Sequence, residues 1–134
     1  MTTFLGNVWQ VFQEFESPDY SEEGIRSFKA FLDDPAAIAV LNLYAAWEAG
    51  RMVGVLATRS QGRHIALLFV DGLSQHKGIG RRLFKAALAA SSDGTLTVNS
   101  SPYALGFYRR LGFIATDTEL TTEGIRYTPL CYPG

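Results

Sequence analysis

Apolar side chains recur along this chain with two different spacings, and the change of spacing predicts where helices give way to strands. Over Leu5–Phe15 they recur every three or four residues, which places them on one face of a helix that the following Glu16-Ser-Pro-Asp ends. A second helix is predicted to begin near Ser21, because the two glutamates that follow it suit the positive end of a helix dipole. Pro35 is expected to end this second helix.

After Pro35 the spacing becomes that of strands. Short runs rich in β-branched, aromatic and aliphatic residues predict three strands, at Leu43–Ala49, Met52–Thr58 and His64–Val70. Tight connections that contain glycine separate the three runs. We therefore expect these strands to form an antiparallel meander.

The second half of the chain alternates between the two patterns. Helical spacing returns over Ile79–Ala90, and a short strand is predicted at Thr95–Asn99. Ser101 is expected to cap a further helix, with Pro102 at its first position and Gly112 just past its end. Two closing strands complete the prediction, Phe113–Thr116 and Ile125–Leu130.

This order of elements predicts an α/β or α+β fold with a mixed, mainly antiparallel sheet flanked by about four helices. The 134 residues are enough to bury one core and too few for two ordinary domains, so we expect a single domain over residues 1–134. The net charge of -1 comes from nearly balanced acids and bases. That balance excludes a broad surface for nucleic acid or for a membrane.

Cysteine content and the N-terminal sequence bear on the compartment. Cys131 is the one cysteine, which excludes an intramolecular disulfide and a cysteine-cluster metal site, and no metal cofactor is expected. The chain does not open with a basic segment followed by a long apolar one, and no apolar run approaches the roughly 20 residues of a membrane span. A cytoplasmic protein is therefore predicted.

The loop Gln75–Arg81 lies between a predicted strand and a predicted helix. A helix N-terminus offers unpaired backbone N–H groups and the positive end of a dipole, and the glycines Gly78 and Gly80 would let the backbone approach an anion. The loop does not match a dinucleotide fingerprint, which needs a third glycine at Leu83, or a P-loop, which needs Gly-Lys followed by Ser or Thr. An isolated Gly-x-Gly can also simply shape a turn.

The surrounding sequence favours a specific anion. Three motifs follow one another, Leu68-Phe-Val70 with Gln75-x-x-Gly78-x-Gly80 and Arg81-Arg-Leu-Phe, then Thr97-Val-Asn99, then Ala104-Leu-Gly-Phe-Tyr108-Arg-Arg-Leu-Gly-Phe113. Together they resemble the acetyl-coenzyme A-binding region of the Gcn5-related N-acetyltransferase (GNAT) superfamily. The resemblance covers the chain from Leu43 to its C-terminus, and the combination of motifs is much more specific than any one of them.

The resemblance implies where acetyl-coenzyme A would bind. In this superfamily the strand corresponding to His64–Val70 splays from the one corresponding to Thr95–Asn99, and pantetheine fills the gap. Backbone groups near its end would bond the pantetheine amides, and N–H groups of the loop would hold the pyrophosphate, with Lys77 and Arg81 as electrostatic partners. The implied coenzyme-binding residues are Phe69, Val70, Gln75, His76, Lys77, Gly78, Ile79, Gly80, Arg81 and Asn99.

Two features depart from the superfamily pattern. His76 stands where many relatives have glycine, and it would be either a phosphate contact or proton carrier, or a solvent-facing loop residue. Thr2–Phe4 is too short for the strand with which relatives usually open. The sheet is therefore expected to lack that edge strand, and the edge left exposed would be covered by a partner chain, as in a homodimer.

Acetyl transfer to an amine needs a proton for the departing thiolate, and Tyr108 matches the tyrosine to which the superfamily assigns this role. It could instead be a packed amphipathic tyrosine. Asn99 would contact the pantetheine arm or a water, or simply cap its strand. No general base is identifiable, since the candidates are expected to be structural or solvated and ordered water can carry the amine proton; these candidates are Glu22, Glu23, His64 and Asp71. A nucleophilic role for Cys131 lacks a paired histidine, so a small buried thiol is expected.

The sequence thus predicts an N-acetyltransferase that moves an acetyl group from acetyl-coenzyme A to a primary amine of a small molecule or peptide. The alternative is a non-catalytic module that binds coenzyme A as a sensor, against which Tyr108 argues because a sensor needs no proton donor. A third reading is an interaction protein that uses an exposed helix with Trp9 and Phe12. The N-terminal helices and the last hairpin would select the acceptor, and they carry no diagnostic motif.

Overall fold

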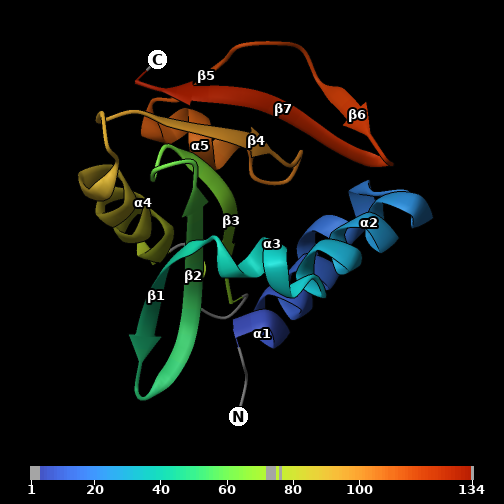
Figure 1. Ribbon diagram of the computed structural model, residues 1–134, viewed down its shortest axis with the longest axis horizontal. Coiled ribbons are helices and arrows are strands. Elements are labelled where there is room, and N and C mark those ends of the chain that lie inside the picture. Colours follow the sequence, from blue (N-terminus) through green and yellow to red (C-terminus); the bar gives the residue numbers. More distant parts are fainter. Residues whose placement is uncertain (1–3, 72–74, 76, 134) are drawn as a thin grey trace.

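The strands predicted after Pro35 form one mixed, mainly antiparallel sheet in the computed structural model, which describes residues 4–71, 75 and 77–133. Its order is β1-β2-β3-β4-β7-β5, with β6 paired to β7 (Figure 1). The predicted fold class and the antiparallel meander are confirmed. The strands are β1 (Asn42–Glu48), β2 (Arg51–Arg59), β3 (His64–Val70), β4 (Leu96–Ser100), β5 (Ile114–Ala115), β6 (Leu120–Thr122) and β7 (Ile125–Tyr132). The helices are α1 (Phe4–Val11), α2 (Glu22–Leu32), α3 (Pro35–Ala39), α4 (Ile79–Ala90) and α5 (Leu105–Leu111).

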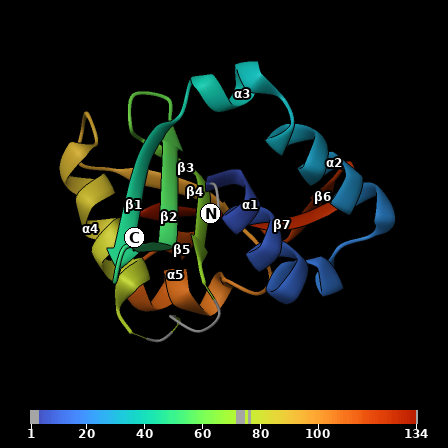
Figure 2. The same cartoon turned by 90° about the horizontal axis from the view of Figure 1, so that it is seen from below.

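Helices cover both faces of the sheet, α4 and α5 one face and α1 and α2 the other (Figures 1 and 2). The residues of β2 between its ends are buried on both faces, which accounts for its continuous apolar sequence. Residues buried on the α4/α5 face include Val53, Leu56, Ile65, Leu83, Phe84, Leu96 and Val98. Residues buried on the α1/α2 face include Val8, Phe12, Leu32, Val55, Leu67 and Phe69.

Prolines were misread at two helix ends. Pro35 does not end α2, which stops at Leu32; it begins α3, because Asp34 caps the next turn by accepting a hydrogen bond from the N–H of Ala36 at 3.0 Å. Pro102 does not begin α5, which starts at Leu105. Ser101 does accept a bond from the N–H of Ala104 at 3.2 Å, but it caps a turn that precedes the helix.

Other boundaries also differ from the prediction. The first predicted helix is α1 followed by a π-helical segment (Phe12–Glu16) and a 3₁₀ turn (Ser17–Asp19). Phe12 is fully buried, with its ring centroid 4.2 Å from that of Phe28, so the predicted exposed interaction surface is wrong at this residue. Strand β6 was not predicted, and β5 is shorter than expected.

One edge of the sheet is β1, and within residues 4–71, 75 and 77–133 no strand lies outside it. Leu43 and Trp47 on this edge strand are 51% and 64% exposed. The homodimer expected from the sequence stays a prediction, which sedimentation velocity would test. Over the same described residues, no helix is both long and apolar enough to cross a bilayer.

Strands β3 and β4 run parallel, but only the first two residues of β3 pair with β4, His64 with Thr97 and Ile65 with Val98. The two strands then diverge, because the register of β3 against β2 shifts and leaves Ala66 as an extra residue. This β-bulge turns the strand, so that Ile65 packs on the α4/α5 face and Leu67 on the α1/α2 face.

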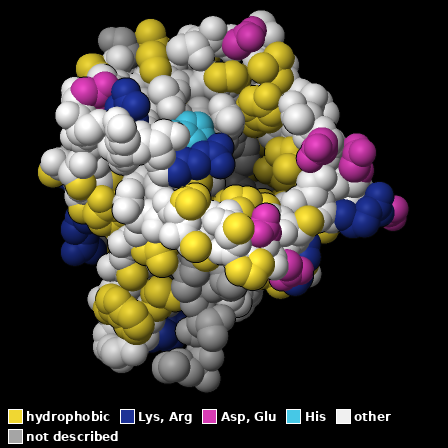
Figure 3. Space-filling model, in the orientation of Figure 1, with side chains coloured by type: hydrophobic (Ala, Val, Ile, Leu, Met, Phe, Trp, Pro, Cys, Tyr) yellow, Lys and Arg dark blue, Asp and Glu magenta, His cyan; other side chains and the backbone are white. Residues whose placement is uncertain are grey.

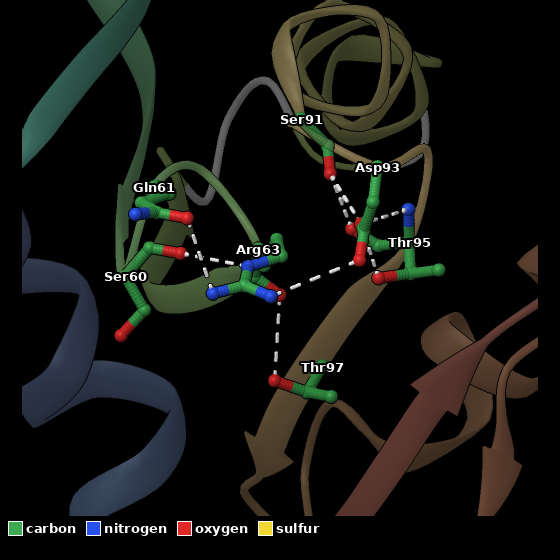
Figure 4. A network of polar contacts seen from close by, with 7 residues as sticks. All are labelled: Ser60, Gln61, Arg63, Ser91, Asp93, Thr95 and Thr97. Carbon is green, nitrogen blue, oxygen red and sulfur yellow. Dashed lines mark hydrogen bonds and ion pairs between the residues drawn. The ribbon is translucent and has the colours of Figure 1, made fainter.

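A polar network ties the two strands together at their closed end (Figure 4). Asp93, in the loop before β4, accepts hydrogen bonds from the hydroxyl and the N–H of Thr95 at 2.6 and 3.0 Å, and these two bonds lower the pKa of its carboxyl. Arg63, in the turn before β3, lies 3.8 Å from the same carboxylate. Its carbonyl accepts a bond from the N–H of Thr97 at 2.7 Å. The network fixes the point from which the strands diverge.

Candidate active site

A small cavity of about 80 Å³ lies where β3 and β4 diverge. Both strands, the start of α5 and the α2 side of the molecule contribute to its wall. Its lining residues are Tyr20, Phe28, Ile65, Ala66, Leu67, Leu68, Phe69, Val98, Asn99, Ser100, Ser101, Ala104 and Tyr108. The cavity therefore joins residues of all three predicted motifs, from β3, from β4 and from α5 with its N-cap residue Ala104.

Asn99 and Tyr108 reach this cavity from different elements. Residues alternate along β4, with Leu96, Val98 and Ser100 buried, so Asn99 is exposed toward the α1/α2 face. Tyr108 on α5 is 3% exposed, and its ring meets that of Phe113 edge to face at a centroid distance of 5.3 Å. Tyr108 is thus both packed and part of the cavity wall, so its two sequence-based readings are compatible.

The free edge of β3 presents backbone groups to the cleft. The N–H of Asp71 bonds the carbonyl of Val53 at 2.8 Å, and because ladder bonds alternate along a strand, the polar groups of Val70 and Leu68 point away from β2. The side-chain amide of Gln75 donates to the Val70 carbonyl at 3.0 Å, in agreement with that direction.

Phe69, which was predicted beside Val70 as a coenzyme-binding residue, lines the cavity and packs in the α1/α2 core. Its side chain is 6% exposed, and its ring centroid lies 5.8 Å from that of Phe28. By the same alternation, its backbone faces β2. Sequence analysis did not identify Leu68 as a coenzyme-binding residue. Its position two residues before Val70 on the same strand could have identified it.

The N-terminus of α4 lies at the open end of the cleft. Gly78 is its N-cap with φ of +79°, a conformation that favours glycine, and no side chain caps the helix there. Ile79 is buried in the core and anchors the first turn. Lys77 and Arg81 are exposed, and the amine of Lys77 lies 3.9 Å from a carboxylate oxygen of Glu48. His76, also predicted to bind the coenzyme, lies outside the described residues.

Gly80 has a different role from that of Gly78. A Cβ built on Gly80 would lie 3.0 Å from Cζ of Phe107, whereas a Cβ on Gly78 would meet open space. Gly80 therefore permits the close approach of α4 to α5. The structure gives no indication that a side chain at Gly80 would enter the anion site.

His64 lies at the closed end of the cleft. Its Nδ1 is 2.8 Å from Oγ1 of Thr97, whose hydroxyl donates to the Arg63 carbonyl at 3.4 Å. Burial, and after it the positive charge of Arg59, lower the pKa of His64 from 6.5 to about 4. The imidazole is therefore neutral at physiological pH, and its Nδ1 shares a hydrogen bond with the hydroxyl of Thr97.

The other chemical candidates are spread over the fold. Asp71 forms an ion pair with Arg51 at 2.8 Å, whereas Glu22 is exposed and lies 3.9 Å from Arg26, so the first carboxylate is structural and the second is solvated. Cys131 is half-buried on β7, and its sulfur lies 4.0 Å from the carbonyl of Pro133. Across the described ranges, no group of three His, Cys, Asp or Glu side chains could hold a metal ion.

Comparison with known proteins decides the family, because the family model described as "Acetyltransferase (GNAT) domain" matches residues 16–132 of this chain. The chain belongs to the GNAT acetyltransferase family. The peptidyl-lysine N-acetyltransferase YjaB of Escherichia coli K12 is 30% identical over 104 residues, which are 77% of this chain and 66% of that protein. This GNAT chain thus spans just under two thirds of that relative.

Solved structures share the GNAT fold. A GCN5-related N-acetyltransferase from Rhodopseudomonas palustris superposes with a TM-score of 0.78 at 23% identity, over 95% of this chain and 85% of that one. The PaiA N-acetyltransferase of Thermoplasma acidophilum, in complex with coenzyme A, gives 0.66 at 16% identity, over 94% and 88%. At these identities the likeness concerns the fold alone.

Proposed function

We propose that this GNAT chain is an N-acetyltransferase that transfers an acetyl group from acetyl-coenzyme A to a primary amine of a small molecule or peptide. The observation that carries the proposal is the divergence of β3 and β4 around a cavity that Tyr108 lines. The α4 N-terminus follows the end of β3 along the chain and has no side-chain cap. One site therefore combines a cleft, anion-binding groups and a proton donor.

The residues present suit coenzyme A. Backbone groups of Leu68 and Val70 would bond the pantetheine amides along the free edge of β3. The N–H groups of residues 79–81 would hold the pyrophosphate, with charge from Lys77 and Arg81, and the space beside Gly78 leaves room for it. When bound, acetyl-coenzyme A supplies an activated acyl group as a thioester.

The chain's own groups have distinct roles in this proposal. The bulge at Ala66 leaves that residue outside the ladder with β2, so its backbone can turn to the cavity and donate a hydrogen bond where negative charge develops on a carbonyl oxygen. Tyr108 holds a proton at its hydroxyl and delivers it to the departing thiolate. Asn99 holds a polar contact or a water at the same cavity.

One relative supports a peptide amine as the acceptor. YjaB of E. coli is named as a peptidyl-lysine N-acetyltransferase, which favours an amine carried by a peptide over the small molecules that the sequence leaves open. The alternative function is a coenzyme A sensor without turnover. A sensor needs no tyrosine hydroxyl in the cavity, so Tyr108 favours the enzyme.

Thiol release from acetyl-coenzyme A in the presence of amines tests the proposal, with polyamines, aminoglycosides, amino acids and lysine peptides as the panel. If the chain is the proposed enzyme, thiol release depends on the amine, and acetyl-coenzyme A raises the melting midpoint. The stabilisation should be about 2.7 kcal/mol at a hundredfold excess of ligand over Kd. Stabilisation without release would favour the sensor. The absence of both would contradict the proposed binding site.

A further inference from the structure

The outer edge of β1 presents backbone groups that have no partner in the sheet. Gly54 of β2 turns its polar groups away from β3 and pairs with Ala46 of β1. Because ladder bonds alternate along a strand, Leu43, Ala45 and Trp47 direct their N–H and C=O groups outward. The bulge in this ladder adds its residue to β2, so β1 itself stays regular. Within residues 4–71, 75 and 77–133, no hydrogen bond reaches these outward groups.

The side chains of the same three residues form an apolar stripe. Tyr44 and Ala46 pack against the α4/α5 core, so Leu43, Ala45 and Trp47 lie on the opposite face. Helix α1 packs on β2 and β3 and leaves the stripe exposed. Figure 3 shows hydrophobic side chains gathered at the lower left of this face, over the end of β1. Edge strands are commonly protected by lysine or proline, and β1 has neither.

We infer that β1 is an interface with a second copy of this chain, in which the two β1 strands pair antiparallel about a two-fold axis at Ala45 and join both sheets into one. The inference is independent of the proposed function. Leu43 of each copy then lies opposite Trp47 of the other, and Asn42 lies opposite Glu48. Every contact therefore occurs twice, as a two-fold interface requires.

The hydrogen-bonding groups favour this register. Outward residues meet outward residues along the whole strand, so each such pair exchanges both of its bonds. Leu43 and Trp47 form an apolar cross-strand pair on each side of the small Ala45. A shift by two residues would place Trp47 opposite Ala45, or opposite Leu41, whose N–H already bonds the carbonyl of Ile38 at 3.1 Å.

The charges favour an antiparallel second copy. The carboxylate of Glu48 would face the side-chain amide of Asn42, which can donate a hydrogen bond to it. Two copies paired in parallel would instead place Glu48 beside Glu48, and like charges directly opposite each other destabilise a strand pair. Lys77, whose amine lies 3.9 Å from Glu48, balances this charge within each copy.

The interface is small, which sets its expected strength. Strand β1 supplies seven residues, against roughly 20–30 a side in a stable complex. Continuing the register places Val40, which is 67% exposed, opposite Gly50 of the other copy, where an added Cβ would meet open space. We therefore expect a dimer with Kd on the order of 10 µM.

Sedimentation velocity tests the interface at concentrations from well below to well above this Kd. The native chain should change from monomer to dimer, and Ala45→Pro should stay monomeric, because it removes an N–H that faces outward and none that bonds β2. Ile114→Lys is the control, since this 53% exposed residue lies on β5 at the other edge, and it should dimerise as the native chain does. Melting midpoints of the dilute chains identify the folded variants.

A pair of charge substitutions tests the register. Leu43→Lys and Trp47→Glu should each weaken the dimer by on the order of tenfold, and the fold should tolerate both because the two side chains are exposed. The double variant should restore the dimer, since each introduced lysine would face an introduced glutamate. Leu43→Lys also serves as the test of the edge if Ala45→Pro does not fold.

Four results would overturn the inference. The first is a native chain that stays monomeric at every concentration, which would leave the edge open to some other partner. The second is a native-like dimer in folded Ala45→Pro or Leu43→Lys, and the third is loss of the dimer in Ile114→Lys. The fourth is a double variant that dimerises no better than Leu43→Lys or Trp47→Glu alone, which would refute the register.

Discussion

The hydroxyl of Tyr103 donates a hydrogen bond of 2.7 Å to the side-chain oxygen of Gln75, whose amide donates in turn to the carbonyl of Val70. Tyr103 follows β4, and Val70 ends β3. The two hydrogen bonds therefore connect the walls of the cleft at its open end. They also occupy a carbonyl that pantetheine is proposed to use.

Coenzyme A must displace this connection, so Tyr103→Phe should speed its association. The bond is at least partly exposed, and its loss should raise the association rate a few-fold at most, with a small fall in melting midpoint. Stopped-flow fluorescence measures the rate. Tyr127→Phe is the control, because it removes the hydroxyl contact with Thr122 on the distant hairpin. Equal rates for Tyr103→Phe and the native chain would contradict the prediction.

Gly80→Ala should destabilise the fold. Its new Cβ would lie 3.0 Å from Phe107, so α4 and α5 must move apart, at a cost of about 1–3 kcal/mol in the free energy of unfolding. Urea denaturation measures this difference. Gly106→Ala on the exposed side of α5 should instead leave stability unchanged or slightly higher. A Gly80→Ala chain as stable as the native one would show that the two helices can adjust.

Tyr108→Phe should separate chemistry from binding. The phenyl ring keeps its contact with Phe113, but the proton is gone, and kcat should fall by roughly 10²–10⁴-fold. Water can also deliver the proton to a thiolate, which would place the loss at the low end of this range. Coenzyme affinity and melting midpoint should stay near native values. A native kcat would refute the proton donor, and a joint loss of fold and affinity would support a packing role.

His64 should make stability depend on acid pH. Its folded pKa of about 4 lies below the ordinary 6.5, so the unfolded chain binds a proton that the folded chain does not. The corresponding part of the free energy of unfolding is fully present above pH 6.5 and is lost as pH falls toward 4. His64→Gln should therefore show a smaller fall in melting midpoint over this window, and so should Arg59→Gln, which removes the second cause of the shift. Parallel curves for all three chains would contradict the prediction.

Features set by local sequence could be predicted. Gly112 after α5, with φ of +111°, follows from the fit of glycine to a helix C-terminus. The meander and the order of the motifs were also recognised. The position of Tyr108 beside the cavity follows from the family resemblance, because periodicity alone gives only its helix.

Features set by long-range contacts could not be predicted. The bulge at Ala66 appears only when β3 is paired with β2. The contact between α2 and the β6–β7 turn brings together Gly24 and Gly124, which lie a hundred residues apart in sequence. Pro35 was misassigned because the same residue suits the position after one helix and the first position of another. His64 was set aside because its partner Thr97 belongs to a strand distant in sequence.

Ala66 also decides how β3 tolerates the loss of a residue. Thr58 and Ala57 are consecutive on β2 and pair with Ile65 and Leu67, so deletion of Ala66 would make this pairing continuous. Because neighbouring side chains of a strand lie on opposite faces, Ile65 and Leu67 would keep the faces that they already occupy, and both cores would stay in register. The cores therefore do not require the extra residue, and its consequence is for the shape of the cleft alone.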